Sequence, residues 1–214
     1  MKIGIIGAGS IGKLYASLWI TAGHQVMLSS RHPEKIKQSP EFIDNTAIGT
    51  PAEAARFGET VLLAVNYESL DSAIASIQLD VNDKLVIDAT NPLVWTENGN
   101  TTKVISDEDI SVQRVSKRLS EARIAKAFTT LWTGYVEQYS NVNNPEIAMP
   151  FATDNQQDRI TVSELIKDAG LIPVDLGKLS NSRPLDPPSP IWNVALNKKE
   201  LIQRLNRFRN KFAV

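Results

Sequence analysis

The sequence predicts an α/β protein with a doubly wound, mostly parallel sheet. Short apolar stretches, typical of strands buried on both faces, alternate with segments whose apolar residues recur at helical spacing. A glycine-rich turn lies between the first such stretch and the first such segment. The length of 214 residues suits one domain with a small extension. Together these observations favour a Rossmann-type fold.

The first βαβ unit occupies about thirty residues at the N-terminus. Residues 2–6 are apolar and rich in Ile, and residues 25–29 read as a second strand. Between them Ile11, Leu14 and Leu18 form a helical stripe, which Gly23 ends.

The remaining elements follow the same alternation. Pro150 argues for an edge or end position of its strand, and residues 135–144 read as a loop or an irregular helix. The polar stretch 93–109 is expected to cover a cleft. We assign residues 1–132 to a nucleotide-binding domain and residues 133–214 to a smaller part that completes the sheet. Strands are expected near residues 47–48, 60–65, 84–88, 124–128, 146–152 and 172–177, and helices at 51–57, 70–77, 111–119, 157–169 and beyond 194.

The turn itself reads Gly7-Ala8-Gly9-Ser10-Ile11-Gly12. Gly7 permits a tight bend, Gly9 lets the backbone approach a pyrophosphate, and Gly12 lets the helix lie close to the strand. The N–H groups of Ser10 and Ile11 would then face an anion at the helix N-terminus. The context of strand, turn and helix predicts nucleotide binding, and the alternative is a glycine-rich turn without a ligand.

The residues after the second strand select the nucleotide. No acid stands at its end to accept from a ribose 2′-OH; Ser30, Arg31 and Lys35 are there instead. Their donors suit a 2′-phosphate, so we predict NADP rather than NAD. A solvated basic loop is the alternative, and Glu34 is a competitor for Arg31. His32 is expected to be exposed, with stacking on adenine as a second interpretation.

Ligands of such sheets lie beyond the carboxyl ends of the strands. Asn66 and Asn91 suit ribose or carboxamide contacts there, or else bond their own turns. The strand ends that border the predicted cleft, besides the glycine turn and Ser30-Arg31, are Val65-Asn66-Tyr67, Asn91-Pro92 and Thr129-Thr130-Leu131-Trp132.

Composition excludes several function classes. The net charge of −1 gives no general attraction to nucleic acid or to anionic membranes. The chain has no cysteine and only two histidines, neither at a metal-ligand spacing, so we expect no metal. No apolar run approaches the roughly 20 residues that span a bilayer, and a cytoplasmic protein without a nucleic-acid or membrane partner is expected.

With these motifs placed, nearly the whole chain resembles the NADP oxidoreductases that work with the deazaflavin coenzyme F420, and the reductase domains of the STEAP metalloreductases are similar. The resemblance rests on residues 7–12, on Ser30-Arg31 with Lys35, on Thr129-Thr130, and above all on Leu179-Ser180-Asn181-Ser182-Arg183. The chain also lacks the large helical domain of related ketoacid reductases, so their catalytic Lys is not expected here.

The resemblance implies that the N-terminal fold binds NADP and that the C-terminal part holds a flat redox acceptor. Hydride would move between nicotinamide C4 and deazaflavin C5, which requires orientation more than a dedicated acid, and no catalytic residue is named. Thr129, Thr130 and Trp132 would border the nicotinamide. The acceptor pocket would involve Ser180, Ser182, Arg183 and Trp192; the alternative is a polar turn that pins the proline-rich segment to the sheet, with Trp192 as packing.

The leading hypothesis is therefore an NADP-dependent oxidoreductase with a small-molecule acceptor, deazaflavin first and flavin second. One alternative is a non-catalytic NADP(H)-binding redox sensor. Another is a reductase of a small carbonyl or imine, with Tyr67 as proton donor. A homodimer is expected through the proline-rich segment 180–190 and the terminal helix.

Overall fold

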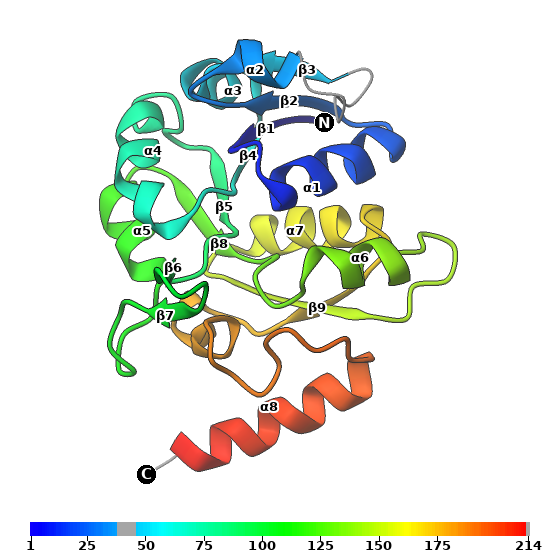
Figure 1. Ribbon diagram of the computed structural model, residues 1–214. Helices are drawn as coiled ribbons and strands as arrows, with labels where there is room; N and C mark the ends of the chain where they lie inside the picture. Colours follow the sequence, from blue (N-terminus) through cyan, green and yellow to red (C-terminus); the bar gives the residue numbers. More distant parts are fainter. Residues whose placement is uncertain (38–45, 213–214) are drawn as a thin grey trace. The chain divides into compact units, whose positions relative to one another are not determined.

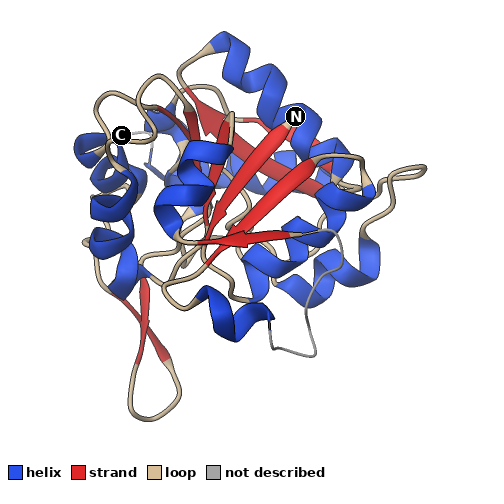
Figure 2. Ribbon diagram, turned by 90° about the horizontal axis from the view of Figure 1, so that it is seen from above, coloured by secondary structure: helices blue, strands red, loops and turns tan. Residues whose placement is uncertain are grey.

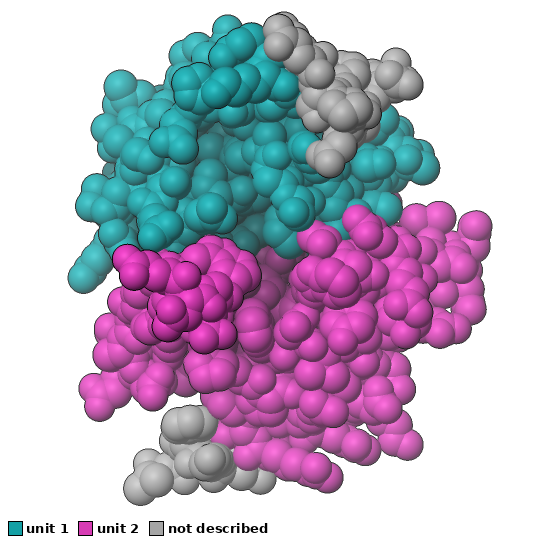
Figure 3. Space-filling model, in the orientation of Figure 1, with its two compact units in different colours: residues 1–90, 114–124 teal, residues 91–113, 125–214 magenta. Residues whose placement is uncertain are grey.

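The computed structural model describes residues 1–37 and 46–212, the last four by backbone alone. It contains two compact units that interleave along the chain (Figure 3). Unit 1 comprises Met1–Thr90 and Arg114–Ile124, and unit 2 comprises Asn91–Gln113 and Ala125–Val214. The proposed division of labour between residues 1–132 and 133–214 stays a prediction.

Unit 1 carries five parallel strands (Figure 1). They are β1 (Lys2–Ile6), β2 (Gln25–Ser29), β3 (Ala47–Gly49), β4 (Thr60–Leu63) and β5 (Leu85–Asp88). Their spatial order is β5-β4-β1-β2-β3, and every neighbouring pair is parallel. The direction of winding reverses between β1 and β4, which is the switch point of a Rossmann-type sheet. The predicted fold class is confirmed.

Two helices cover opposite faces of β1. A Cβ built on Gly4 would lie 2.1 Å from the carbonyl oxygen of Ala54 in α3 (Pro51–Phe57). A Cβ on Gly12 of α1 (Ser10–Thr21) would lie 3.3 Å from the side chain of Ile5. Successive strand residues face opposite sides, so Gly4 and Ile5 place α3 and α1 on different faces.

The other helical elements of unit 1 are short. The elements are α2 (Pro33–Lys37), a 3₁₀ turn η1 (Tyr67–Ser69), α4 (Leu70–Ile77) and the part of α5 (Val112–Arg118) from Arg114 onward. α2 begins at a proline, Pro33, and α3 begins with Thr50 and Glu53 as a capping box.

Unit 2 carries the strands β9 (Ala148–Thr153) and β10 (Ile172–Asp175), which are parallel, and the end of β8 (Arg123–Lys126), which pairs antiparallel with β9. The segment expected as a loop or an irregular helix is α6 (Thr133–Tyr139). The other helical elements are α7 (Gln156–Asp168), the 3₁₀ turns η2 (Leu179–Asn181) and η3 (Arg183–Leu185), and α8 (Lys198–Phe212).

Pro150 is expected at an edge or an end of its strand; β9 is not an edge strand along its whole length, because it lies between β10 and β8. The N–H of Ala148 donates to Leu196 O at 2.8 Å, away from β10. By the two-residue alternation of a strand, the Pro150 nitrogen also points away from β10. Pairing with β8 begins only at Ala152. Pro150 therefore occupies a place where the ladder needs no donor, near the end of the pairing.

The polar stretch after β5 contains an antiparallel hairpin that the sequence did not predict. Its strands are β6 (Leu93–Trp95) and β7 (Thr101–Lys103), a short two-stranded ribbon separate from the larger sheet (Figure 2). The Trp95 side chain is 68% exposed. Two three-residue strands give too short a hydrophobic alternation to detect. That this stretch covers a cleft stays a prediction.

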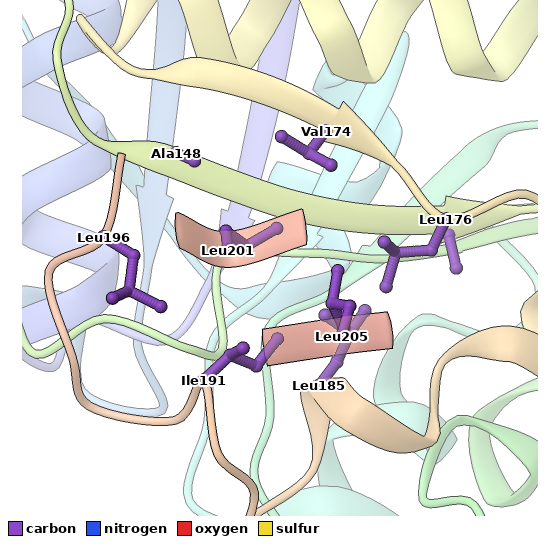
Figure 4. Packing of buried hydrophobic residues seen from close by; sticks show 9 residues of the cluster. Ala148, Val174, Leu176, Leu185, Ile191, Leu196, Leu201 and Leu205 are labelled. Atoms are coloured by element: carbon purple, nitrogen blue, oxygen red, sulfur yellow. The ribbon is translucent and has the colours of Figure 1, made fainter. Parts of the chain in front are cut away.

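An apolar cluster lies between the β9–β10 pair and α8 (Figure 4). Leu201 and Leu205 of α8 are 2% and 3% exposed there. The other buried members are Ala148, Ala152, Val174, Leu176, Leu185, Ile191 and Leu196. Because these apolar residues of the proline-rich segment and α8 pack inside unit 2, they are not available for the expected dimer contact. The homodimer stays a prediction without that basis.

No helix in the described part of the chain is long and apolar enough to cross a bilayer.

Candidate functional site

The glycine turn of unit 1 has two crowded positions and one open position. Gly7 has a φ of +113°, and a Cβ there would lie 2.3 Å from Ala64 O. A Cβ on Gly12 would lie 2.0 Å from Gly7 O. Around a Cβ on Gly9, by contrast, no atom of the described residues lies within 4 Å, apart from those of Gly9 itself and its chain neighbours. Gly7 and Gly12 thus permit the bend and the close packing of α1, while the space beside Gly9 is open, as the motif predicts.

The first turn of α1 leaves backbone donors available. Gly9 is the N-cap residue and has no side chain with which to cap the helix. The first helical hydrogen bond runs from Lys13 N to Gly9 O at 3.0 Å, so the N–H groups of Ser10, Ile11 and Gly12 have no acceptor within the helix. Gly9 and Ser10 are exposed. An anion such as a pyrophosphate fits this helix end by charge and by space.

The end of β2 supplies the residues predicted for the 2′-phosphate. Ser30 N donates to Gly49 O at 3.2 Å, and Ser30 Oγ accepts from His32 N at 3.0 Å. This second bond leaves the hydroxyl proton of Ser30 available to another acceptor. Arg31 and Lys35 are exposed.

Glu34, the expected competitor for Arg31, lies elsewhere. Its carboxylate is 3.5 Å from His32 Nδ1. Among residues 1–37 and 46–208, no carboxylate forms an ion pair with Arg31. Within the described part of the chain, the donors of the Arg31 guanidinium are thus not taken up by a carboxylate. His32 is exposed, as expected, and its stacking on adenine stays a prediction.

The residues after β4 differ in their surroundings. Asn66 is exposed and its side chain makes no capping hydrogen bond, so it does not behave as a turn residue bonded to its own backbone. Tyr67 is 4% exposed and has the Arg114 guanidinium 5.2 Å from its ring centre. The Tyr67 hydroxyl is buried and has no hydrogen-bond partner among the described residues, and its role as a proton donor stays a prediction.

Arg114 is held in turn by Asp71. Its Nη2 and Nε donate to the two carboxylate oxygens at 2.6 and 3.2 Å, and Arg118 Nη2 lies 3.4 Å from the same carboxylate. The hydrogen bond from Arg114 lowers the pKa of Asp71, and the same bond, with a contribution from Tyr67, raises the pKa of Arg114. Sequence reasoning missed this arrangement because Asp71 and Arg114 are 43 residues apart.

In unit 2, a short series of hydrogen bonds connects Asn91 with the segment after β8. Its Nδ2 donates to Thr129 O at 3.1 Å, and Thr129 Oγ1 donates to Leu185 O at 3.0 Å. The Oδ1 of Asn91 is buried and has no hydrogen-bond partner in the described part of the chain. Because a buried polar atom without a partner is uncommon, this oxygen is available to a ligand that carries an N–H or O–H group.

The other residues predicted near the nicotinamide fall into two groups. Thr130 is buried and its hydroxyl lies 3.8 Å from Met149 sulfur, so it belongs to the core. Trp132 is 63% exposed and meets Tyr135 edge-on, with ring centres 5.9 Å apart. Trp132 can therefore present a flat apolar surface, whereas Thr130 offers no free group.

The segment with the most specific family resemblance spans η2 and η3. Ser182, between them, is fully buried, and its hydroxyl has no hydrogen-bond partner among the residues that the structure describes. Arg183 donates to the backbone oxygens of Asp107 and Glu108. These bonds favour the pinning alternative for Arg183. Ser180 is exposed and Trp192 is partly buried.

A buried charged group beside this segment was not among the predicted site residues. Lys126 of β8 is fully buried, with its Nζ 3.8 Å from Asp186 Oδ1. Asp186 also accepts from Ser111 N at 2.8 Å and from Ser111 Oγ. A lysine in an otherwise apolar strand was the signal in the sequence. In the described residues no cluster of His, Asp and Glu could hold a metal ion.

Comparison with known proteins agrees with this arrangement. The model of the family described as "NADP oxidoreductase coenzyme F420-dependent" matches residues 2–92. The chain is 27% identical to the F420-dependent NADP reductase of Methanothermobacter thermautotrophicus, over 98% of this chain and 92% of that protein. It is 22% identical to the metalloreductase STEAP3 of Rattus norvegicus, over 86% of this chain and 36% of that protein.

Among solved structures, a putative F420-dependent NADP-reductase from Arthrobacter sp. FB24 superposes with a TM-score of 0.75 at 20% identity. It covers 86% of this chain and 87% of that chain, which supports the fold. The resemblance predicted from the sequence is thus confirmed, and the chain is related to the coenzyme F420-dependent NADP oxidoreductases through its nucleotide-binding half and, more distantly, over nearly its whole length.

Proposed function

We propose that the chain is an NADP-dependent oxidoreductase that transfers hydride between NADP(H) and a flat redox acceptor. Deazaflavin is the first candidate for the acceptor and flavin the second. The observation that carries the proposal is the open end of α1 beside Gly9 together with Arg31 at the end of β2, which forms no ion pair with a carboxylate of the described residues. Relatives of nearly equal length are named F420-dependent NADP reductases, which favours deazaflavin.

Unit 1 would hold the phosphates of the cofactor. The N–H groups of the first turn of α1 would donate to the pyrophosphate, and the helix dipole would add attraction for the negative charge. Ser30, Arg31 and Lys35 would bind the 2′-phosphate, Arg31 through its forked donors. Val65, Asn66 and Tyr67 would border the adjoining ribose and phosphates.

Unit 2 would supply contacts to the nicotinamide and to the acceptor. The unpartnered Oδ1 of Asn91 suits a carboxamide N–H, since its Nδ2 is already bonded to Thr129 O. Pro92 adjoins this oxygen because it follows Asn91 in the chain. Thr129 adjoins it because its backbone oxygen accepts the bond from Asn91 Nδ2. The buried Ser182 hydroxyl suits a carbonyl or ring nitrogen of a flat acceptor. Trp132 would offer a stacking surface, and Ser180 and Trp192 would shape the edge of the pocket.

In the proposed reaction NADPH gives a hydride from C4 to the acceptor, and one proton from solvent completes the reduced deazaflavin, leaving NADP⁺. The chain's own residues bind and orient the two reactants. Such orientation is sufficient for a large acceleration, because it makes the transfer effectively unimolecular. No residue is required to carry a covalent intermediate.

An anaerobic assay with NADPH and 8-hydroxy-5-deazaflavin tests the proposal. Loss of the oxidised deazaflavin absorbance is expected with NADPH, with a much slower rate when NADH replaces it. FMN in place of deazaflavin identifies the second candidate. Tight NADPH binding with turnover of neither acceptor would refute the hydride-transfer function and favour the redox-sensor alternative.

A further inference from the structure

The buried group formed by Lys126, Asp186 and Ser111 has no part in the hydride transfer proposed above. The exposed fractions of these residues are 0%, 5% and 2%. Removing two opposite charges from water carries a large desolvation cost, and an apolar pair would give comparable stability. The group therefore calls for an explanation other than stability alone.

Asp186 connects three parts of unit 2. Its carboxylate accepts from Ser111 N at 2.8 Å and from Ser111 Oγ, at the end of the loop that follows the β6–β7 hairpin. The same carboxylate lies 3.8 Å from Lys126 Nζ in β8. It belongs to the chain segment that continues directly from η3.

Three further bonds hold the same segment at its other positions. Leu185 O accepts from Thr129 Oγ1 at 3.0 Å, and Arg183 donates to the backbone of the loop at residues 107 and 108. The segment 182–186 is thus fixed both to Thr129, which follows β8, and to the loop at residues 107 and 108. Ser182, with its unpartnered buried hydroxyl, begins this segment.

We propose that Asp186 is a positioning residue, which holds the segment 182–186 so that the Ser182 hydroxyl and the Asn91 Oδ1 keep the places where they meet the acceptor and the nicotinamide. Lys126 and Ser111 act through Asp186. A carboxylate is suited to this role because it accepts from several donors at once and so fixes the backbone that carries it. The role at the acceptor rests on the function proposed above; the clamping of the segment does not.

Amide hydrogen exchange tests the clamp without any acceptor. Ser182 N, Leu185 N and Asp186 N each donate to a backbone oxygen of a 3₁₀ turn, at 3.0, 2.8 and 3.2 Å. In Asp186→Asn these amides should exchange at least tenfold faster. Ser111→Ala, which keeps both charges, should give a smaller increase, and Ser111→Thr should behave as the wild type. Unchanged exchange in both Asp186→Asn and Ser111→Ala would overturn the proposal.

Steady-state kinetics then tests the effect on the acceptor. Asp186→Asn should raise the KM for deazaflavin at least tenfold while the Kd for NADPH changes less than threefold. Ile166→Ala serves as the control, because this fully buried residue of α7 lies outside the cluster that contains Leu185 and its loss should lower the melting temperature alone. Equal increases in KM for Asp186→Asn and Ile166→Ala would show a merely structural role. If the wild type turns over no deazaflavin but exchange rises in Asp186→Asn, the clamp stands and the proposed function fails.

Discussion

Replacement of Arg31 by Ala should separate binding of NADPH from binding of NADH. The Arg31 guanidinium has no carboxylate partner among the described residues, since Glu34 lies 3.5 Å from His32 instead. A charge-assisted hydrogen bond contributes about 1.5–3 kcal/mol, and solvent reduces this for an exposed side chain. A loss of about 1.4–2 kcal/mol corresponds to a roughly 10–30-fold weaker affinity for NADPH.

Isothermal titration calorimetry of both nucleotides provides the measurement. NADH lacks the 2′-phosphate, so its affinity should change less than about twofold. Arg56→Ala is the matched control, because this exposed arginine of the same unit pairs with Asp80 at 3.4 Å and should leave both affinities unchanged. An equal loss for NADPH and NADH in Arg31→Ala would refute the assignment of the 2′-phosphate.

Three further predictions concern the cofactor turn and stability. Gly9→Val should fold with a melting temperature lower by only about 2–4 °C, because the φ of Gly9 is −76° and the space beside it is open. Calorimetry should nevertheless show that binding of both nucleotides falls at least about 100-fold. Retained affinity would place the cofactor elsewhere. Asp71→Asn should lower the free energy of unfolding by less than about 1 kcal/mol at pH 7. Because Arg114 depresses the Asp71 pKa, the stability difference between wild type and Asp71→Asn should be complete above the ordinary pKa of Asp and vanish as the pH falls through the lowered pKa. Chemical denaturation at a series of pH values measures this difference. A difference that persists in strong acid would contradict the ion-pair explanation. Leu201→Ala should cost about 2–5 kcal/mol in urea denaturation, and a cost below about 1 kcal/mol would show that α8 does not pack on the sheet as described.

Local patterns predicted most of the strands and helices correctly. The five strands of unit 1 fall where apolar runs stand in the sequence, since strands buried on both faces need side chains that favour burial throughout. The hairpin of residues 93–103 escaped notice because each of its strands is only three residues long. Pro150 lies where β9 pairs with β10 alone, near the end of the pairing with β8, and the sequence pattern does not show on which side the missing donor would lie.

The cofactor half of the candidate site was also readable from the sequence. The glycine turn and the residues Ser30, Arg31 and Lys35 lie within one βαβ unit, where strand, turn and helix follow each other directly. Only the structure showed that Glu34 approaches His32 rather than Arg31. Which of the two residues Glu34 approaches depends on the direction in which α2 orients its side chains, and the sequence alone does not specify that direction.

The sequence by itself determined the fold class, the glycine turn between strand and helix and the relationship to NADP oxidoreductases, because each depends on short-range spacing of glycine and apolar residues. The tertiary structure alone decided which polar groups are satisfied and which remain free. Asp186 meets Ser111 across 75 residues of chain, and Asn91 meets Thr129 across 38. Such contacts arise when packing of distant elements brings their polar atoms together, and no local propensity encodes them. The structure was therefore needed to show that the side-chain oxygens of Asn91 and Ser182 are buried without a hydrogen-bond partner among the described residues.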